Sequence, residues 1–590
     1  MYDELVHSIV RQRARAHVAE ERLEVNYYRV RRRVSYPLPI RAICLPDLPV
    51  RTLRDYPWAT WMLWALEERI SALGWAAAWF YEEHAYQETV ERDLEALAGW
   101  PRFDQYGYPD LALGHSLRTL VRAQRDWPWL SPHVHEVARA ACARAAEQYR
   151  EWIDTQRDGL QTANDILARP NRERIVANIP MIGTLALAMA ARLAGHEIAA
   201  RLDRHALALV EALFELRRAG HTEGVAYDGY VLDFVADWLR DADPAAQRRV
   251  LSNPQLISTL DQSILLAAPG QPMDVAPIGD VEPREMPFHA SAHAKLANLR
   301  SLPRSVVYLY RCPLEWLRSD ALAALFQLGD SNPREQGRVH ALNAGALESQ
   351  YALVLRSGWH DGDAAVIMAA SSCAMTHLHR DNGTIVIGTA RHWLIDDPGY
   401  QQYMESAERE FTVGRTAHNA PVINGHAQTE RRADRLACGQ ITPDAWHAAA
   451  DITGCYDPAL GLKSVRRYAW LLGRKLVIVA DRIEGESLAE VEYFWHGHPD
   501  AAWWVDQGAA IIHLGGTALW IWCSRTPLAE RQIDRLPGSR GQLTACVRLP
   551  AERELTVWWM FGIGERPPEP AFEDDGRTMN VADRRLTIEG

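Results

Sequence analysis

Three absences limit what this chain of 590 residues can be. Its eight cysteines form no CxxC pair, which excludes a zinc knuckle and a disulfide framework, so we interpret them as buried free thiols. It has no basic excess, since the formal net charge of −12 argues against a general nucleic-acid binder. It also has no apolar run long enough for a membrane span, because the most apolar stretch, MIGTLALAMAARLAG at 181–195, is too short and contains an arginine. We therefore expect neither a nucleic-acid nor a membrane partner.

The N-terminal residues do not have the pattern of a secretion signal. The first residues, MYDELVHSIVRQRARAHVAEERLEV, are charged throughout and lack the apolar segment of such a signal. We therefore expect a cytoplasmic protein, although a trimmed chain would look the same and would fit a periplasmic or secreted location. The length predicts two or more domains, and both a monomer and a homodimer fit the sequence.

The two halves of the chain differ in periodicity. Between residues 51 and 340, segments such as LWALEERISALGWAAAWF and ALALVEALFELRRAG repeat apolar residues at helical spacing. Gly195 and Gly220 are placed to end helices, and Pro180 is expected at the first position of a helix. Between 341 and 590, short apolar runs alternate with turn signals at hairpin distances. We predict an α+β multidomain fold with a helical domain followed by an antiparallel β-sandwich, and a boundary at 340/341.

The segment THLHRDNG at 376–383 stands just before an apolar run, TIVIG. In an extended strand, His377, His379 and Asp381 would project from one face. The following GTIVIGTARHWLIDDPG predicts a hairpin with its turn near 389–390. Pairing across that turn would place Asp397 opposite residue 382, close to His379. This arrangement is either a polar solvent face or a cluster of reactive groups.

A metal set is one interpretation of this cluster. His379, Asp397 and His418 supply the nitrogen and oxygen ligands that zinc or a similar divalent ion prefers, with one coordination position left over. The alternative is a solvated strand face, which we favour for the second HxH pair, His496 and His498, because it lacks comparable neighbours. For Asp381 we expect the task of orienting a histidine.

The segments THLHRDNGTIVIGTARHWLIDDPGYQQY and RTAHNAPVINGHAQ resemble the C-terminal half of the heparinase II/III-like family. The shared pattern is H-x-H-x-D, an apolar hairpin, D-x-G-x-x-x-Y, then HN and NG-x-x-Q, and it is strongest over 350–500. The resemblance implies an incomplete (α/α) toroid at 51–340, with residues 1–50 as an extension packed on it, and an antiparallel sheet domain at 341–590. It also implies a polysaccharide lyase acting on uronic-acid-containing glycans, with a metal that is structural.

The resemblance assigns catalytic roles to residues in both halves. In IVANIPMIGT, Asn178 matches the asparagine that binds the uronate carboxylate, the alternative being an ordinary helix cap. In EGVAYDGY, Tyr227 matches the catalytic tyrosine, with Tyr230 as the second candidate. His377 matches the catalytic histidine. The family often has a histidine beside the asparagine, and its absence here puts in doubt a second base and activity on both uronate epimers.

Further residues have supporting roles in this scheme. Glu223 is expected to support the tyrosine, and Asn419 to contact the substrate. Arg415 suits the acidic groups of the substrate, although a structural ion pair is an equal alternative. The metal set of His379, Asp397 and His418 fits the family as well, with zinc expected and manganese or calcium as alternatives.

We expect a lyase that cleaves 4-linked uronic-acid-containing glycans by β-elimination. Glycosaminoglycans such as heparan, chondroitin and hyaluronan, and alginate-type oligouronides, are all candidate substrates. Two alternatives stay open, namely a metal-dependent glycan hydrolase and a non-catalytic glycan-binding or assembly protein with the same fold.

Overall fold

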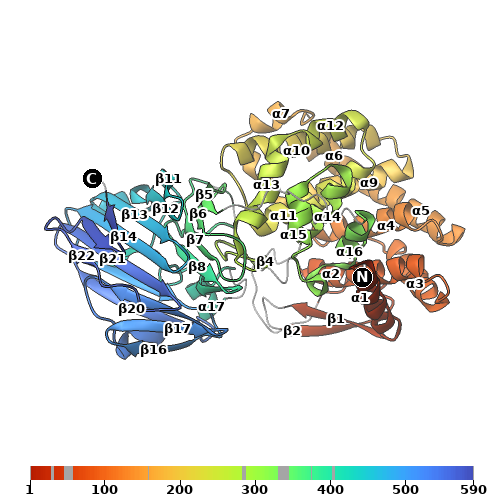
Figure 1. Ribbon diagram of the computed structural model, residues 1–590. Helices are drawn as coiled ribbons and strands as arrows, with labels where there is room; N and C mark the ends of the chain where they lie inside the picture. Colours follow the sequence, from red (N-terminus) through yellow and green to blue (C-terminus); the bar gives the residue numbers. More distant parts are fainter. Residues whose placement is uncertain are drawn as a thin grey trace. The chain divides into compact units, whose positions relative to one another are not determined.

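The computed structural model describes residues 2–27, 32–45, 58–156, 159–281, 288–329, 344–373, 375, 377–400 and 405–588. The chain divides into two compact units (Figure 1). The helical unit comprises Met1–Ala219, Val225–Leu260 and Met286–Val339, and the sheet unit comprises Gly220–Gly224, Asp261–Glu285 and His340–Gly590. The predicted boundary at 340/341 lies outside the described residues, and the predicted domain division stays a prediction.

The described residues of the first unit are mainly helical, as the periodicity predicted, and they include one small hairpin that was not predicted. The hairpin pairs β1 (Arg22–Tyr27) with β2 (Arg32–Pro37). The helices are α1 (Tyr2–Val18), α2 (Trp58–Trp79), α3 (His84–Ala98), α4 (Leu111–Asp126), α5 (Pro132–Gln148), α6 (Arg150–Gln156), α7 (Ala163–Leu167), α8 (Arg172–Ile175), α9 (Asn178–Ala194), α10 (Ala199–Arg218), α11 (Val225–Arg240), α12 (Pro244–Leu251), α13 (Pro254–Leu265), α14 (Phe288–Leu299), α15 (Pro303–Leu309) and α16 (Ser319–Gln327). The helix α13 runs from this unit into the sheet unit.

Helix α9 is central to the helical unit. It packs against α4, α5, α10 and α11, and twelve of its seventeen residues are buried because its sequence is mostly apolar. It begins at Asn178, two residues earlier than expected, so that Pro180 falls in its first turn rather than at its first position. It ends at Gly195, whose φ of 63° lies in the left-handed region that glycine adopts freely.

A network of buried charges fills the interior of the helical unit. The Arg118 guanidinium donates two hydrogen bonds to Glu67, at 2.7 and 2.8 Å, and a third to Asp233. Both Arg118 and Glu67 are at most 1% exposed. The other members, joined by ion pairs of 4 Å or less, are Arg122, Asp237, Lys295, Arg318 and Asp320. Arg125 extends the network through Asp237 at 3.2 Å, and Glu68 extends it through Arg318 at 3.9 Å, so each of these buried charges has a partner of opposite sign.

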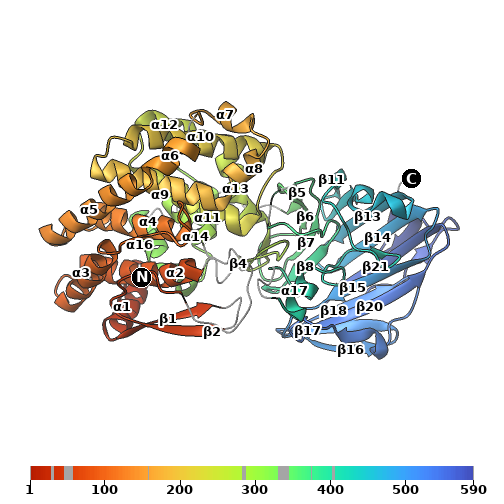
Figure 2. The same cartoon turned by 180° about the vertical axis from the view of Figure 1, so that it is seen from behind.

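The second unit is built from antiparallel strands, as predicted. A five-stranded sheet has the order β5 (Gly345–Glu348), β6 (Ala352–Arg356), β7 (Ala364–Ala369), β8 (Ile385–Thr389), β9 (His392–Ile395). An eight-stranded sheet has the order β11 (Asp434–Thr442), β12 (Ala445–Asp451), β13 (Leu462–Leu472), β14 (Leu476–Gly485), β21 (Glu554–Ile563), β18 (Thr517–Cys523), β17 (Ala509–Leu514), β16 (Ala502–Asp506). Figure 2 shows several of these strands from behind.

Smaller sheets complete the sheet unit. One has the order β10 (Val422–Ile423), β15 (Glu490–His496), β20 (Leu543–Pro550), β19 (Ile533–Arg535). Another joins β22 (Ala571–Phe572), β23 (Thr578–Val581) and β24 (Arg584–Thr587), and the last pairs β3 (Ala267–Ala268) with β4 (Gln271–Val275). A short helix, α17 (Ala407–Thr412), follows β9.

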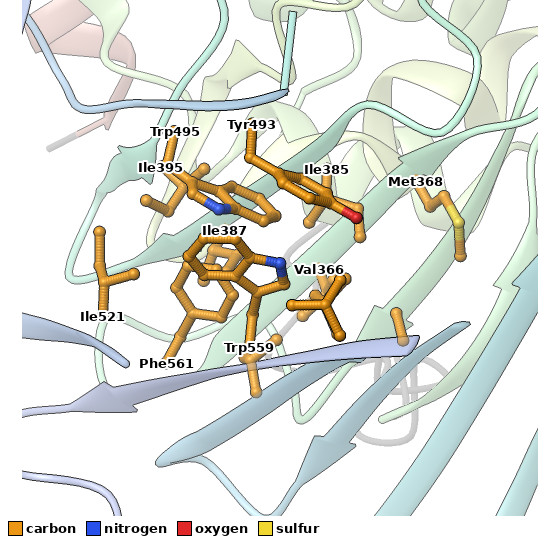
Figure 3. Packing of buried hydrophobic residues seen from close by; sticks show 14 of the residues in the cluster. Val366, Met368, Ile385, Ile387, Ile395, Tyr493, Trp495, Ile521, Trp559 and Phe561 are labelled. Atoms are coloured by element: carbon orange, nitrogen blue, oxygen red, sulfur yellow. The ribbon is translucent and has the colours of Figure 1, made fainter. Parts of the chain in front are cut away.

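One hydrophobic core joins the larger sheets. Trp559 from β21 packs against Tyr493 and Trp495 from β15, with ring centroids 5.2 and 5.4 Å apart. Ile385 and Ile387 from β8 complete the same cluster (Figure 3). These side chains face one another from different sheets, which is the packing of a β-sandwich. Both the helical N-terminal region and the antiparallel sheets of the predicted fold class are therefore confirmed.

The predicted hairpin at 385–395 is confirmed, with its turn one residue later than expected. Thr389 pairs with His392, and the two turn residues, Ala390 and Arg391, both have positive φ. This backbone is that of the tight turn that best joins two twisted strands. Within the part of the chain that the structure describes, no helix combines the length and apolar character needed to cross a membrane.

Candidate functional site

The segment that carries the two histidines is a loop, so the predicted strand is wrong. It connects β7, which ends at Ala369, with β8, which begins at Ile385. His377 has a φ of 71°, which no strand residue adopts. A turn then closes with a hydrogen bond from the Thr384 amide to the Asp381 carbonyl, and Gly383 supplies a φ of 82°. The histidines therefore do not share a strand face, and their neighbours come from elsewhere in the unit.

The neighbour that joins them is Asp280, a residue that the sequence did not identify. Its Oδ2 lies 2.8 Å from Nδ1 of His377, and its Oδ1 lies 3.1 Å from Nε2 of His379. Asp280 is only 3% exposed. Burial alone would raise the pKa of Asp280, but the two histidines hold it well below its usual range. One ionised carboxylate therefore holds both rings.

His377 faces a second carboxylate on its other side. Its Nε2 lies 3.7 Å from Oε1 of Glu223, while its side chain keeps 19% of its surface exposed. Glu223 is buried and comes from the short segment 220–224 that belongs to the sheet unit. The ring is thus fixed on one edge and accessible in part, which suits a group that exchanges protons.

His379, Asp381 and His418 form a cluster that can hold a metal ion. One ligand atom from each lies within 4.8 Å of the others, and all three side chains are buried. Nδ1 of His379 and Oδ2 of Asp381 are buried polar atoms with no hydrogen-bond partner among the described residues. Two imidazoles and a carboxylate are a donor set that zinc prefers, and two orphaned donor atoms are what such an ion would satisfy. The residues therefore fit the expected metal.

Asp381 and Asp397 have the opposite of the roles that the sequence predicted for them. Asp397, predicted as a ligand, has its Oδ2 3.0 Å from Nδ1 of His418 and is not in the cluster that the described residues form. Asp381, predicted to orient a histidine, is in the cluster. The reason is that β9 ends at Ile395 and β8 begins at Ile385, so Asp397 is not paired with residue 382. Burial would lower the pKa of His418, but Asp397 raises it above its usual value.

Asn419 is used by the fold, which corrects its predicted contact with the substrate. Its amide group donates to the carbonyls of Ile385 and Asp396, at 2.9 and 2.6 Å, and its carbonyl oxygen accepts from the amide of His496 at 2.8 Å. The side chain is 2% exposed. Both amide protons and the oxygen are therefore engaged with backbone, and Asn419 ties three chain segments together beside His418.

Arg415 forms an ion pair within the protein, which was the alternative to its predicted contact with the substrate. Its guanidinium lies 2.7 Å from Oε2 of Glu492 and is 43% exposed. It also lines a hollow of about 490 Å³ together with Arg380, His379 and His418. The hollow belongs to the sheet unit and borders the metal cluster on one side.

The predicted residues of the helical unit begin two helices. Asn178 is the first residue of α9 and is 3% exposed, and the capping position belongs to Ala177, so Asn178 is not an ordinary helix cap. Tyr227 lies in the first turn of α11 and is 7% exposed. These two residues belong to the helical unit and His377 to the sheet unit.

Tyr230 lies deeper in the same helix. Its hydroxyl is hydrogen-bonded to Nε2 of His115 and lies 3.2 Å from Nε1 of Trp64, and the residue is 1% exposed. Burial raises the pKa of Tyr230 well above its usual value. The ring also stacks on Phe288, with centroids 4.4 Å apart. Tyr230 is therefore a packing residue of the helical interior, which leaves Tyr227 as the better candidate.

Residues 344–556, which carry the loop, the hairpin and His418, match the family model described as heparinase II/III-like, C-terminal. This part of the chain is a heparinase II/III-like C-terminal domain. The resemblance on which the site residues were assigned is thus confirmed. No curated protein sequence matches the chain.

The similarity to solved heparinase structures extends over nearly the whole chain. The chain is similar to the heparan sulfate lyase HepC from Pedobacter heparinus, with a TM-score of 0.55 and 12% identity over 98% of this chain and 88% of that one. It is also similar to heparinase III, with a TM-score of 0.58 and 11% identity over 91% of this chain and 84% of that one. The likeness shows that the heparinase II/III-like domain here follows a helical region of the same fold.

Proposed function

We propose that the chain is a polysaccharide lyase that cleaves 4-linked uronic-acid-containing glycans by β-elimination and releases unsaturated uronates. The observation that carries this proposal is His377, a partly exposed imidazole held by Asp280 within a heparinase II/III-like domain. Similar structures bear the names heparan sulfate lyase and heparinase III, so heparan is the first substrate to test. Chondroitin, hyaluronan and alginate-type oligouronides follow it.

The proposed reaction needs three tasks. A base removes the proton at C5 of the uronate, the electrons form the C4–C5 double bond, and the C4–O4 bond breaks as an acid protonates O4. A neutral hydrogen-bond donor at the uronate carboxylate stabilises the negative charge that moves onto it. In this proposal Tyr227 is the acid that protonates O4, His377 is the base that takes the proton from C5, and Asn178 binds the carboxylate. Glu223 supports His377 from its Nε2 side.

We also propose a divalent ion, zinc first and manganese or calcium as alternatives, at His379, Asp381 and His418. An ion there would join the loop that carries His379 to the segment that carries His418. Its role in this proposal is structural, and the lyase chemistry is left to the chain's own residues. The hollow beside the cluster favours one alternative, a metal-dependent glycan hydrolase, because it gives the ion's position access from outside.

The decisive experiment is a screen for products on heparan, chondroitin, hyaluronan and alginate oligomers. A lyase gives an unsaturated uronate that absorbs in the near ultraviolet, whereas a hydrolase gives new reducing ends without that absorbance. A binding protein gives affinity without turnover. On the active substrate, His377→Asn should reduce kcat by about 10²–10⁴-fold, the usual contribution of a general acid or base. Asparagine is chosen because it tolerates the left-handed backbone at this position.

The matched control is His426→Ala, which removes an exposed histidine of the same domain. It should leave kcat unchanged. An active chain whose His377→Asn variant keeps its rate would show that the catalytic histidine is misassigned. A chain with no unsaturated product on any of the four substrates would contradict the lyase proposal itself.

A further inference from the structure

A single carboxylate contacts both histidines of the HxH motif, through different ring nitrogens. Asp280 reaches Nδ1 of His377 with one oxygen and Nε2 of His379 with the other. The two contacts use opposite edges of the imidazole ring. The two contacts therefore differ in chemical effect, even though His377 and His379 are separated by a single residue in the sequence.

An ionised carboxylate can only accept hydrogen bonds, so each nitrogen that faces it must carry a proton. In the neutral ring, a proton on one nitrogen leaves the lone pair on the other. For His377 the lone pair is then on Nε2, and for His379 it is on Nδ1.

We propose that Asp280 is a positioning residue that assigns the two histidines their separate tasks, committing Nε2 of His377 to proton transfer and Nδ1 of His379 to metal binding. This inference deepens the proposed function and rests on it for the role of His377. The inference goes beyond the proposed function by naming the residue that selects the tautomer of each ring.

The surroundings of the two remaining nitrogens agree with this division. Nε2 of His377 lies 3.7 Å from Oε1 of Glu223, and the His377 side chain keeps 19% of its surface exposed. Nδ1 of His379 is buried without a hydrogen-bond partner in the described part of the chain, and His379 belongs to the cluster with Asp381 and His418. A metal-binding histidine commonly gives its other N–H to a carboxylate, which fixes its orientation.

The second metal-binding histidine follows the same rule. Oδ2 of Asp397 lies 3.0 Å from Nδ1 of His418, which leaves Nε2 for the cluster. Among the described residues, Asp397 hydrogen-bonds to one imidazole ring, whereas Asp280 hydrogen-bonds to two. The difference makes Asp280 the point at which the metal cluster and the proton-transfer group are connected.

Asp280 is held in place by both its backbone and its side chain, which contact the same residue, His377. Its amide donates to the carbonyl of His377 at 2.7 Å, while its side chain accepts from the ring of the same residue. Gly279 precedes it with a φ of 76°, and a Cβ there would come within 2.6 Å of the His377 carbonyl oxygen. This close approach requires glycine, and it sets the carboxylate opposite the two rings.

The Asp280→Asn variant tests the proposal because it keeps the shape and removes one acceptor. An amide presents an oxygen to one ring and an NH₂ group to the other, so one of the two histidines must change tautomer or lose its bond. We expect zinc affinity, measured by competition with a chelator, to fall by at least about tenfold. We expect kcat on the active substrate to fall by at least about tenfold as well, with KM changed by less than about threefold.

The matched control is Asp363→Asn, a carboxylate of the same unit that is equally buried and accepts from the backbone amide of His360. It should lower the melting temperature without changing zinc affinity or kcat. If folded Asp280→Asn keeps both zinc affinity and kcat within about threefold of wild type, the proposal is overturned. If only one of the two falls, the shared role is overturned.

Nitrogen NMR of histidine-labelled wild-type protein gives a readout that depends neither on the folding of Asp280→Asn nor on turnover. Signals assigned by their loss in His377→Asn and His379→Ala should show a proton on Nδ1 of His377 and on Nε2 of His379. The opposite tautomers would refute the assignment. Wild-type protein that makes no unsaturated product would contradict the proposed lyase, while the zinc and NMR measurements would still decide the role of Asp280.

Discussion

Replacing Arg118 by methionine should destabilise the helical unit strongly. The guanidinium makes two hydrogen bonds to Glu67 and one to Asp233, and all three side chains are at most 1% exposed. Methionine has a similar length but leaves two carboxylates without this partner in a medium that solvates charge poorly. Removing one partner of a buried ion pair costs about 3–5 kcal/mol. The expected fall in melting temperature of this unit is on the order of 10 °C.

The assay is thermal unfolding followed by circular dichroism, with hydrogen exchange to locate the loss in the helical unit. The double variant Glu67→Gln, Arg118→Met should be less destabilised than the sum of the two single variants, because it removes an anion together with its cation. The control is Arg150→Met, since Arg150 pairs with Glu147 and Glu197 at the surface and should show no measurable loss. A loss below about 1 kcal/mol for Arg118→Met would refute the reasoning, because it would equal that of a surface pair.

Three further predictions concern single side chains. Tyr227→Phe should abolish formation of the unsaturated product, whereas Tyr230→Phe should mainly lower stability; loss of turnover only in the second variant would reverse the assignment. Chelation should lower the melting temperature of the wild type but not that of His379→Ala or Asp381→Ala, and an equal shift in all three proteins would contradict the metal cluster. Burial lowers the pKa of His115 from 6.5 to about 4, so the unfolded state binds a proton that the folded state excludes between these values. The contribution of His115 to the free energy of unfolding should therefore be complete above about pH 6.5 and should be lost as the pH falls toward 4. The melting temperature of His115→Gln should fall less steeply with decreasing pH than that of the wild type, and equal slopes for the two proteins would contradict this prediction.

The regular elements of the fold could be predicted because their signals are local. Apolar residues recur at helical spacing in one half of the chain and in short runs in the other. These two patterns follow from which face of a helix or a strand must be buried. Helix α9 ends at Gly195 because a left-handed residue suits glycine, and the sequence shows that residue directly. The β8–β9 hairpin was predicted within one residue for the same reason.

The loop before β8 could not be predicted in this way. Polar residues at alternating positions look the same in a half-exposed strand and in a loop, and only tertiary contacts decide between them. His377 adopts a left-handed backbone conformation, which the residue types in THLHRDNG do not indicate. The sequence therefore drew attention to these polar side chains, but it predicted neither the backbone conformation of the loop nor the partners of its histidines.

The partners of the site residues come from distant segments, which a local pattern does not reveal. Asp280 stands 97 residues before His377, in a stretch that carries no spacing relation to it. Asn419 was selected for its place in an HN pair, but its side chain bonds to the backbone of residues 23, 34 and 77 positions away. Which polar group a buried amide satisfies depends on the folded chain and not on its neighbours in the sequence.

The close approach of Gly279 to the His377 carbonyl has a consequence for comparing sequences. A side chain at position 279 would push Asp280 away from both rings, so the glycine and the aspartate must be retained or lost together. At identities of 10 to 13% to solved structures, alignments outside the HxH segment are difficult to anchor. A Gly-Asp pair that lies upstream of the HxH motif gives such an anchor. A related sequence that keeps the two histidines but lacks this pair should need another carboxylate to divide their tasks.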